Sequence, residues 1–216
     1  ANGGAEALAA QTSYSLMMST QDALNRHVGY DWGGKDSRKG GIDCSGWVEE
    51  ISKGMMQQIN AAAGEQVFTA EDFKALDTNA AGIIKNVSEA TGELITGEGL
   101  NPENVRDGMV IGMDTGDHGK DDAGRYKGID HIVQLYRDPV TGEMMVSESR
   151  GKRGVMVSRY EDWYAEQQRK GTRLYGADIM KLGDAEKIKP TQPQAEAENA
   201  EKPATSAENA QAEQQP

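Results

Sequence analysis

The sequence predicts an α+β fold in which helices come first and an antiparallel sheet follows. As far as residue 90, apolar side chains recur with the spacing of three to four residues that is typical of amphipathic helices. From residue 105 onward, short segments of alternating or β-branched apolar residues are separated by turn sequences such as Asp107-Gly108. We therefore expect N-terminal helices that pack on one face of a central, meandering antiparallel β-sheet.

The expected helices cover residues 5–26, 44–55, a short segment from residue 69, 80–90 and 160–169. Asp43 is a favourable N-cap for a helix that begins at Cys44. The apolar residues of that helix follow an i, i+3, i+4, i+7 pattern, which gives it one buried face. Thr69 and Asp72 have the spacing of a capping box, so they predict the start of the third helix.

The expected strands cover residues 105–113, 129–136, 143–149, 155–158 and 173–182. The third of them matters most for function. Because successive side chains of a strand point to opposite faces, Met144, Val146 and Glu148 should share one face, and Met145 and Ser147 the other.

The last part of the chain, residues 183–216, has a different composition. Four of the 6 prolines lie there among Ala, Glu, Gln and Asn, with almost no aliphatic residues after Ile188. Such a segment cannot bury enough apolar surface to offset the entropy of ordering, so we expect a disordered acidic tail. Residues 1–182 then form one domain. Residues 61–102 could be a helical insertion that forms a lid or shapes the substrate groove.

Composition excludes several classes of protein. The formal net charge of −12 disfavours binding to nucleic acid or to an anionic membrane. No stretch approaches the ~20 apolar residues of a transmembrane helix, and residues 1–11 lack the basic and apolar regions of a signal peptide. A single Cys can form neither an internal disulfide framework nor a cysteine-rich zinc site.

No cofactor or metal is expected. The chain lacks a phosphate-binding loop and a dinucleotide fingerprint, and its 3 histidines are scattered. Asp114, Asp117, Asp121 and Asp122 invite a calcium hypothesis, but the residue pattern of an EF-hand is missing. A solvated acidic loop is the better interpretation.

The single cysteine, Cys44, is placed where its thiol could react. In the first turn of a helix, unsatisfied N–H groups and the positive end of the dipole favour the thiolate. The same N–H groups can hold a developing oxyanion, and Gly46 lets a substrate approach the backbone. The alternative is a buried thiol that packs as a small apolar side chain.

A cysteine nucleophile needs a base, and His131 is the best candidate because it lies in a well-defined predicted strand. His118 belongs to an acidic loop, where we expect it to be solvated, and His27 ends the first helix. An imidazole base is normally oriented through its second nitrogen, and Glu148 on the next strand could accept that hydrogen bond. The alternative is that Glu148 is an edge-strand carboxylate in water.

Together these segments resemble the NlpC/P60 family of papain-like cysteine peptidases. Over residues 13–182, the matching motifs are Tyr-Asp-Trp-Gly-Gly at 30–34, Asp-Cys-Ser-Gly-Trp-Val at 43–48, Arg-Asp-Gly-Met-Val at 106–110, Asp-His-Ile-Val at 130–133 and Val-Ser-Glu-Ser-Arg at 146–150, followed by Gly154-Val155. The family tends to have Gly-Asp where residues 107–108 stand, and many members have His at the third catalytic position.

The resemblance implies roles for individual residues. Cys44 would be the nucleophile, His131 the base, and Glu148 the residue that orients the imidazole, with Ser147 as the alternative if the alignment slips by one. On the substrate-binding side, Tyr30 matches the family tyrosine whose hydroxyl lies near the nucleophile. Trp32 and Ser45 are expected there too, and the N–H groups of Cys44 and Ser45 would stabilise the oxyanion.

The resemblance also implies a function: hydrolysis of amide bonds in the stem peptides of bacterial peptidoglycan. These bonds lie outside the cytoplasmic membrane, and no export signal or wall-binding module is visible, so we expect delivery by a carrier. The protein would then be a type VI secretion effector or a phage tail hydrolase, act as a monomer in the periplasm or wall of a target cell, and could face an immunity protein. The alternatives are a cysteine acyltransferase or deamidase acting on a protein, and a non-catalytic papain-like binding module.

Overall fold

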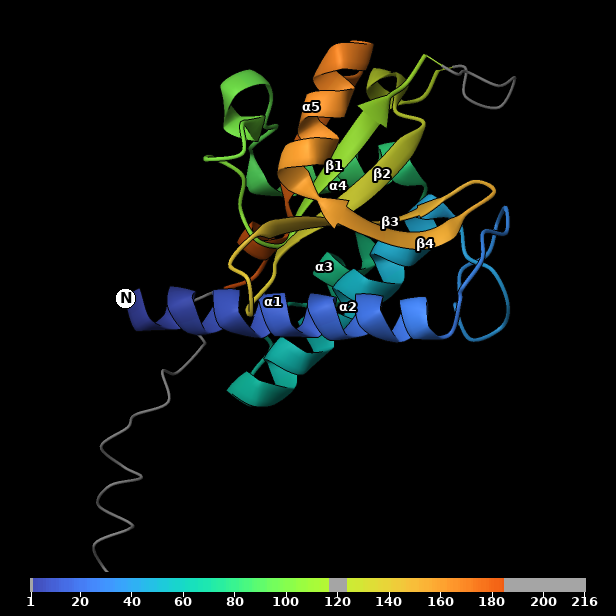
Figure 1. Ribbon diagram of the computed structural model, residues 1–216. Helices are drawn as coiled ribbons and strands as arrows, with labels where there is room; N and C mark the ends of the chain where they lie inside the picture. Colours follow the sequence, from blue (N-terminus) through green and yellow to red (C-terminus); the bar gives the residue numbers. More distant parts are fainter. Residues whose placement is uncertain (1, 117–123, 185–216) are drawn as a thin grey trace, which may run out of the picture.

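The computed structural model describes residues 2–116 and 124–184, which form a five-stranded antiparallel sheet with helices on both faces (Figure 1). The α-helices are α1 (Asn2–Asn25), α2 (Cys44–Ala63), α3 (Ala70–Lys74), α4 (Ala80–Thr91) and α5 (Tyr160–Lys170). The strands are β1 (Met109–Asp114), β2 (His131–Arg137), β3 (Met144–Arg150), β4 (Gly154–Arg159) and β5 (Arg173–Asp178). Short 3-10 helices cover Gly97–Leu100 (η1), Tyr126–Gly128 (η3) and Ile179–Leu182 (η4).

The structure confirms the mixed α+β class and the order of helices followed by an antiparallel sheet. Two of the expected strand bounds differ from the structure by four residues, and the others by one or two at most. Residues 105–108 precede β1 as a turn in which Gly108 has a φ of +82°, a conformation that favours glycine. At the other end, β5 stops at Asp178, whose side chain accepts the N–H of Met180 and so starts η4.

The strand order β4-β3-β2-β1-β5 puts β3 inside the sheet. Its neighbours pair with it on both sides, with Gln134 of β2 opposite Ser147 and Met156 of β4 opposite Glu148. The alternative of an edge-strand Glu148 in water is therefore wrong, and the Glu148 side chain is only 4% exposed.

The N-terminal helices α1, α2 and α4 cover one face of the sheet, as expected. Helix α5 covers the other face, which corrects the expectation that helices pack on one face alone. The larger core lies between the sheet and α1, α2 and α4, and includes Val110 of β1. Ile111, the next residue of β1, points to the opposite core, where Tyr160 and Trp163 of α5 pack. Because consecutive residues of β1 point to opposite faces and both are apolar, each face of the sheet exposes apolar side chains that a helix must cover.

Residues 61–102 do form helices, but α4 is part of the core. Ile83, Ile84 and Val87 of α4 are fully buried in the larger core, where α4 packs on β5 and β1. The residues that line the pocket described below come from outside 61–102. The capping box of Thr69 and Asp72 is present at the start of α3. The expected disordered tail lies, from residue 185 on, outside the described residues, as do His118, Asp117, Asp121 and Asp122.

Candidate active site

The candidate site lies where the N-terminus of α2 meets the start of β2 and the end of β3. Asp43 is the N-cap of α2, and its Oδ1 accepts the N–H of Gly46 at 2.6 Å. The Asp43 Oδ2 accepts the N–H of Gly33, which ties the preceding loop to the helix. These bonds hold Cys44, the first residue of α2, in a fixed position with its side chain partly exposed.

The loop before α2 folds tightly over the helix N-terminus. The N–H of Asp43 donates to the carbonyl of Gly34, and the N–H of Ile42 donates to the carbonyl of Gly29. A Cβ atom at Gly46 would overlap the Gly34 carbonyl oxygen, so the close approach of loop and helix requires glycine at this position. The glycines of this motif therefore let the loop lie directly against the first turn of α2.

Two serines of β3 fix α2 to the sheet. Ser147 Oγ accepts the indole N–H of Trp47 at 2.9 Å and lies 2.8 Å from the hydroxyl of Thr20. Ser149 donates to the carbonyl of Ile42 at 2.7 Å. Both serines are fully buried on the face covered by α1 and α2. Ser147 thus points away from His131 and serves as an anchor for the helix that carries Cys44.

Glu148 points to the opposite face and contacts His131. Its Oε1 lies 3.0 Å from His131 Nε2 and 3.6 Å from Arg150 Nε. The His131 side chain is 18% exposed, so the pair is largely shielded from water. The structure therefore brings together His131 and Glu148, and it separates Ser147 from them.

His131 also interacts with the Cys44 thiol. Burial by itself would lower the pKa of His131, but hydrogen bonds with Cys44 and Glu148, and the negative charges of both groups, raise that pKa to about 10. With Nε2 directed at Glu148, Nδ1 is the ring nitrogen left for the thiol. The imidazole is therefore held between Cys44 and Glu148, in an environment that favours its charged imidazolium form.

Tyr30 lies close to the same thiol. Burial, together with the negative charges of Cys44 and Asp43, raises the pKa of Tyr30 to about 12. Its hydroxyl thus stays neutral and able to donate a hydrogen bond near the thiol at physiological pH. Trp32, two residues later, is 72% exposed, so its ring is available to a ligand.

The side chain of Ser45 is hydrogen-bonded within the protein. Its hydroxyl donates to Asp43 Oδ1 and accepts from the ammonium of Lys35, and the residue is buried. A contact with substrate must therefore come from the Ser45 backbone. Among the described residues, Asp43 accepts the N–H groups of Gly46 and Trp47, which leaves those of Cys44 and Ser45 for an oxyanion.

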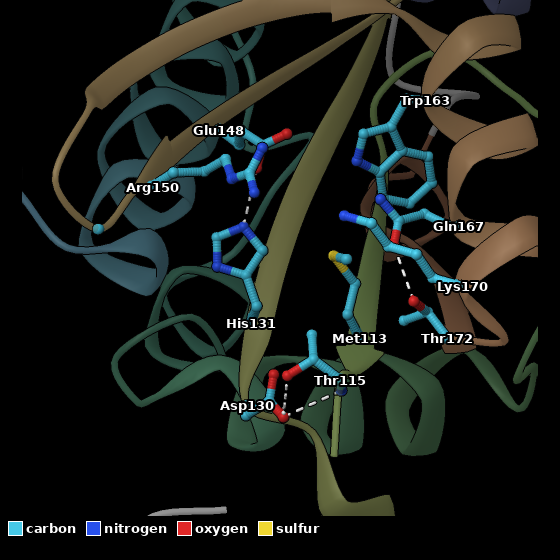
Figure 2. A pocket seen from close by; sticks show the side chains of 11 residues that line it. Met113, Thr115, Asp130, His131, Glu148, Arg150, Trp163, Gln167, Lys170 and Thr172 are labelled. Atoms are coloured by element: carbon cyan, nitrogen blue, oxygen red, sulfur yellow. Dashed lines mark hydrogen bonds and ion pairs between the residues drawn. The ribbon is translucent and has the colours of Figure 1, made fainter. Parts of the chain in front are cut away.

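Beside His131 and Glu148 lies a pocket of about 340 Å³ (Figure 2). Arg150 joins His131 and Glu148 on one wall, and the facing wall is formed by Trp163, Gln167 and Lys170 of α5. Asp130 at the rim accepts hydrogen bonds from the N–H and the hydroxyl of Thr115. The pocket opens on the face of the sheet away from α2.

Sequence reasoning assigned no role to Arg150, Lys170 or Lys35. Arg150 could have been noticed, because it shares a strand face with Glu148 two residues earlier. The position of Lys170 depends on how α5 crosses the sheet, and that crossing leaves no local signal in the sequence.

Within the described residues, no cluster of His, Cys, Asp and Glu could hold a metal ion. In the same part of the chain, no helix is long and apolar enough to span a membrane. Comparison of the sequence with protein-family models and with curated proteins found no match. The function must therefore be argued from the site itself.

Proposed function

We propose that the chain is a cysteine peptidase or amidase that hydrolyses amide bonds in the stem peptides of bacterial peptidoglycan. The observation that supports it most is the placement of His131 between the thiol of Cys44 and the carboxylate of Glu148. Acyl transfer needs a nucleophile, a base that contacts it and a group that orients the base, and these three residues supply them in that order.

The geometry supports a two-step reaction. The Cys44 thiolate attacks the amide carbon, and the N–H groups of Cys44 and Ser45 bind the resulting oxyanion. When the tetrahedral intermediate collapses, the carbon–nitrogen bond breaks and His131 gives its proton to the leaving nitrogen. A thioester on Cys44 remains. Water then attacks the thioester with His131 accepting its proton, so that a carboxylic acid is released and the thiolate is restored.

Two further side chains support this chemistry. The carboxylate of Glu148 fixes the imidazole through Nε2 and stabilises its charged form, so Nδ1 remains directed at the thiol. Tyr30 offers a neutral hydroxyl near the nucleophile, where it can bind a carbonyl of the substrate.

The substrate class rests on the resemblance of the motifs around Cys44 and His131 to NlpC/P60 peptidases. Stem peptides lie in the periplasm or cell wall, so the protein must reach that compartment. We propose that a secretion apparatus or phage tail carries it to a target cell, where an immunity protein would be its natural inhibitor.

Incubation of purified protein with insoluble peptidoglycan tests the proposal. We expect soluble fragments and new primary amines, because each cut amide releases one amino group. The variant Cys44→Ala is the control, since it removes the thiol and leaves the Asp43 cap of α2 in place. Intact peptidoglycan after treatment with folded wild-type protein would contradict the proposal.

The activity should depend on pH through His131. Because the pKa of His131 is raised to about 10, the imidazolium that protonates the leaving nitrogen is present below that pH and is lost as pH rises through it. We expect kcat/KM to fall on the alkaline side near pH 10. In Glu148→Gln, one negative charge beside His131 is gone, so the fall should occur at lower pH. An alkaline limb unchanged in Glu148→Gln would show that another group controls it.

A further inference from the structure

The pocket beside His131 lies on the side of the site where the leaving part of a substrate must go. In the proposed reaction, which this inference takes as its basis, the amide carbon bonds to Cys44 and the leaving nitrogen receives its proton from His131. The leaving residue therefore extends past His131, away from α2. The pocket occupies that side, with His131 and Glu148 in its wall (Figure 2).

The charges in this pocket favour an anion, although the whole chain is acidic. Arg150 and Lys170 both line it, from β3 and from the last turn of α5. The two carboxylates of the lining already have partners: Glu148 contacts His131 and Arg150, and Asp130 accepts two hydrogen bonds from Thr115. The charge that the pocket presents to a ligand is therefore mainly positive, and it comes from Arg150 and Lys170.

Both cations keep donors for a ligand. Lys170 lies 3.0 Å from Glu166, which is outside the pocket lining, and an ammonium has three N–H groups. Arg150 approaches Glu148 through Nε at 3.6 Å, and its guanidinium has four further N–H donors. The two side chains are each 45% exposed, so neither is sealed in the core. In Figure 2 the amino end of Lys170 points into the pocket toward the side of His131.

The rest of the lining suits one amino-acid residue. Trp163 gives an apolar wall, and Gln167 is held in place by the hydroxyl of Thr172. A volume of about 340 Å³ is at the small end of the range for ligand pockets. A short aliphatic stem against Trp163 with an anionic end at Lys170 would use these features together.

We propose that this pocket binds the leaving residue of the substrate, and that Lys170 and Arg150 bind a free carboxylate on that residue. The enzyme would then prefer amide bonds whose released amino group belongs to a residue with an unblocked carboxylate. Lys170 gives the cleaner test, because within the described residues its ion pair is with Glu166, whereas Arg150 also contacts Glu148.

The bond that wild-type protein cuts is identified first, and it defines the leaving residue. The test then uses two soluble stem peptides that differ only at that residue. One peptide has a free carboxylate there, and in the other this group is a carboxamide. We expect wild-type protein to show a kcat/KM about tenfold higher for the free carboxylate, because a charge-assisted hydrogen bond is lost in the carboxamide. In Lys170→Gln the ratio of the two values should approach one.

Arg169→Gln is the matched control. Arg169 is the adjacent cation of α5 and lies 4.0 Å from the same Glu166, but it does not line the pocket. We expect it to keep the wild-type ratio. Equal kcat/KM values for the two peptides in wild-type protein, or the same loss of preference in both variants, would overturn this inference and leave the proposed function intact. No cleavage of either peptide would overturn both.

Discussion

Replacing His131 with asparagine is expected to lower kcat/KM for stem-peptide hydrolysis by about 10³-fold or more. The substitution removes the group that holds the Cys44 thiolate and protonates the leaving nitrogen, and asparagine cannot exchange a proton in its place. His131 is the first residue of β2, so the sheet should still form. The measurement is the initial rate of amine release, with circular dichroism to show that the variant is folded.

His27→Asn is the matched control for this substitution. His27 lies just after α1, is exposed, and has a φ of +55°, a conformation that asparagine tolerates. We expect wild-type rates from it. A comparable loss of activity in both variants, or a folded His131→Asn protein with wild-type rates, would show that His131 is not the base.

The second large effect separates Glu148 from its neighbour Ser147. In Glu148→Ala the imidazole loses the carboxylate that orients it and stabilises its charge, so we expect kcat to fall by about 10²- to 10⁴-fold. In Ser147→Ala the loss should be in stability, because the buried indole N–H of Trp47 is left without its acceptor. Such an unpaired donor costs about 1–3 kcal/mol.

Urea denaturation and steady-state kinetics on the same samples distinguish the two effects. At a temperature where both variants are folded, Ser147→Ala should keep most of its activity although its unfolding midpoint is lower. A larger loss of kcat in Ser147→Ala than in Glu148→Ala would mean that the third position is misassigned. Because the two residues are adjacent on β3, this pair tests the strand alternation itself.

Much of this site could be predicted because its signals are local. The Asp43 cap fixes where α2 begins, and so puts Cys44 in the first turn. Alternation along residues 144–148 puts Glu148 and Ser147 on opposite faces, and the structure confirms it: Glu148 contacts His131, and Ser147 contacts Trp47. These features depend on one helix terminus and one strand.

The features that were missed depend on contacts between distant segments. The order of strands places β3 inside the sheet, and that order is set by long-range pairing rather than by the residues of β3. The same holds for α5, whose Tyr160 and Trp163 cover the second face, and for Lys170, which reaches the pocket only because α5 packs there. A periodicity indicates that a helix has a buried face, but not which face of a sheet it covers.

Hydrolysis of a stem-peptide amide bond through Cys44 can be detected in the products themselves. The decisive measurement is mass spectrometry of the muropeptides from peptidoglycan treated with wild-type protein. We expect that one stem-peptide amide is cut and that the two products together exceed the parent by the mass of one water molecule. Cys44→Ala should yield neither product. Unchanged muropeptides, a cut in the glycan strand, or transfer to an amine in place of water would contradict this expectation.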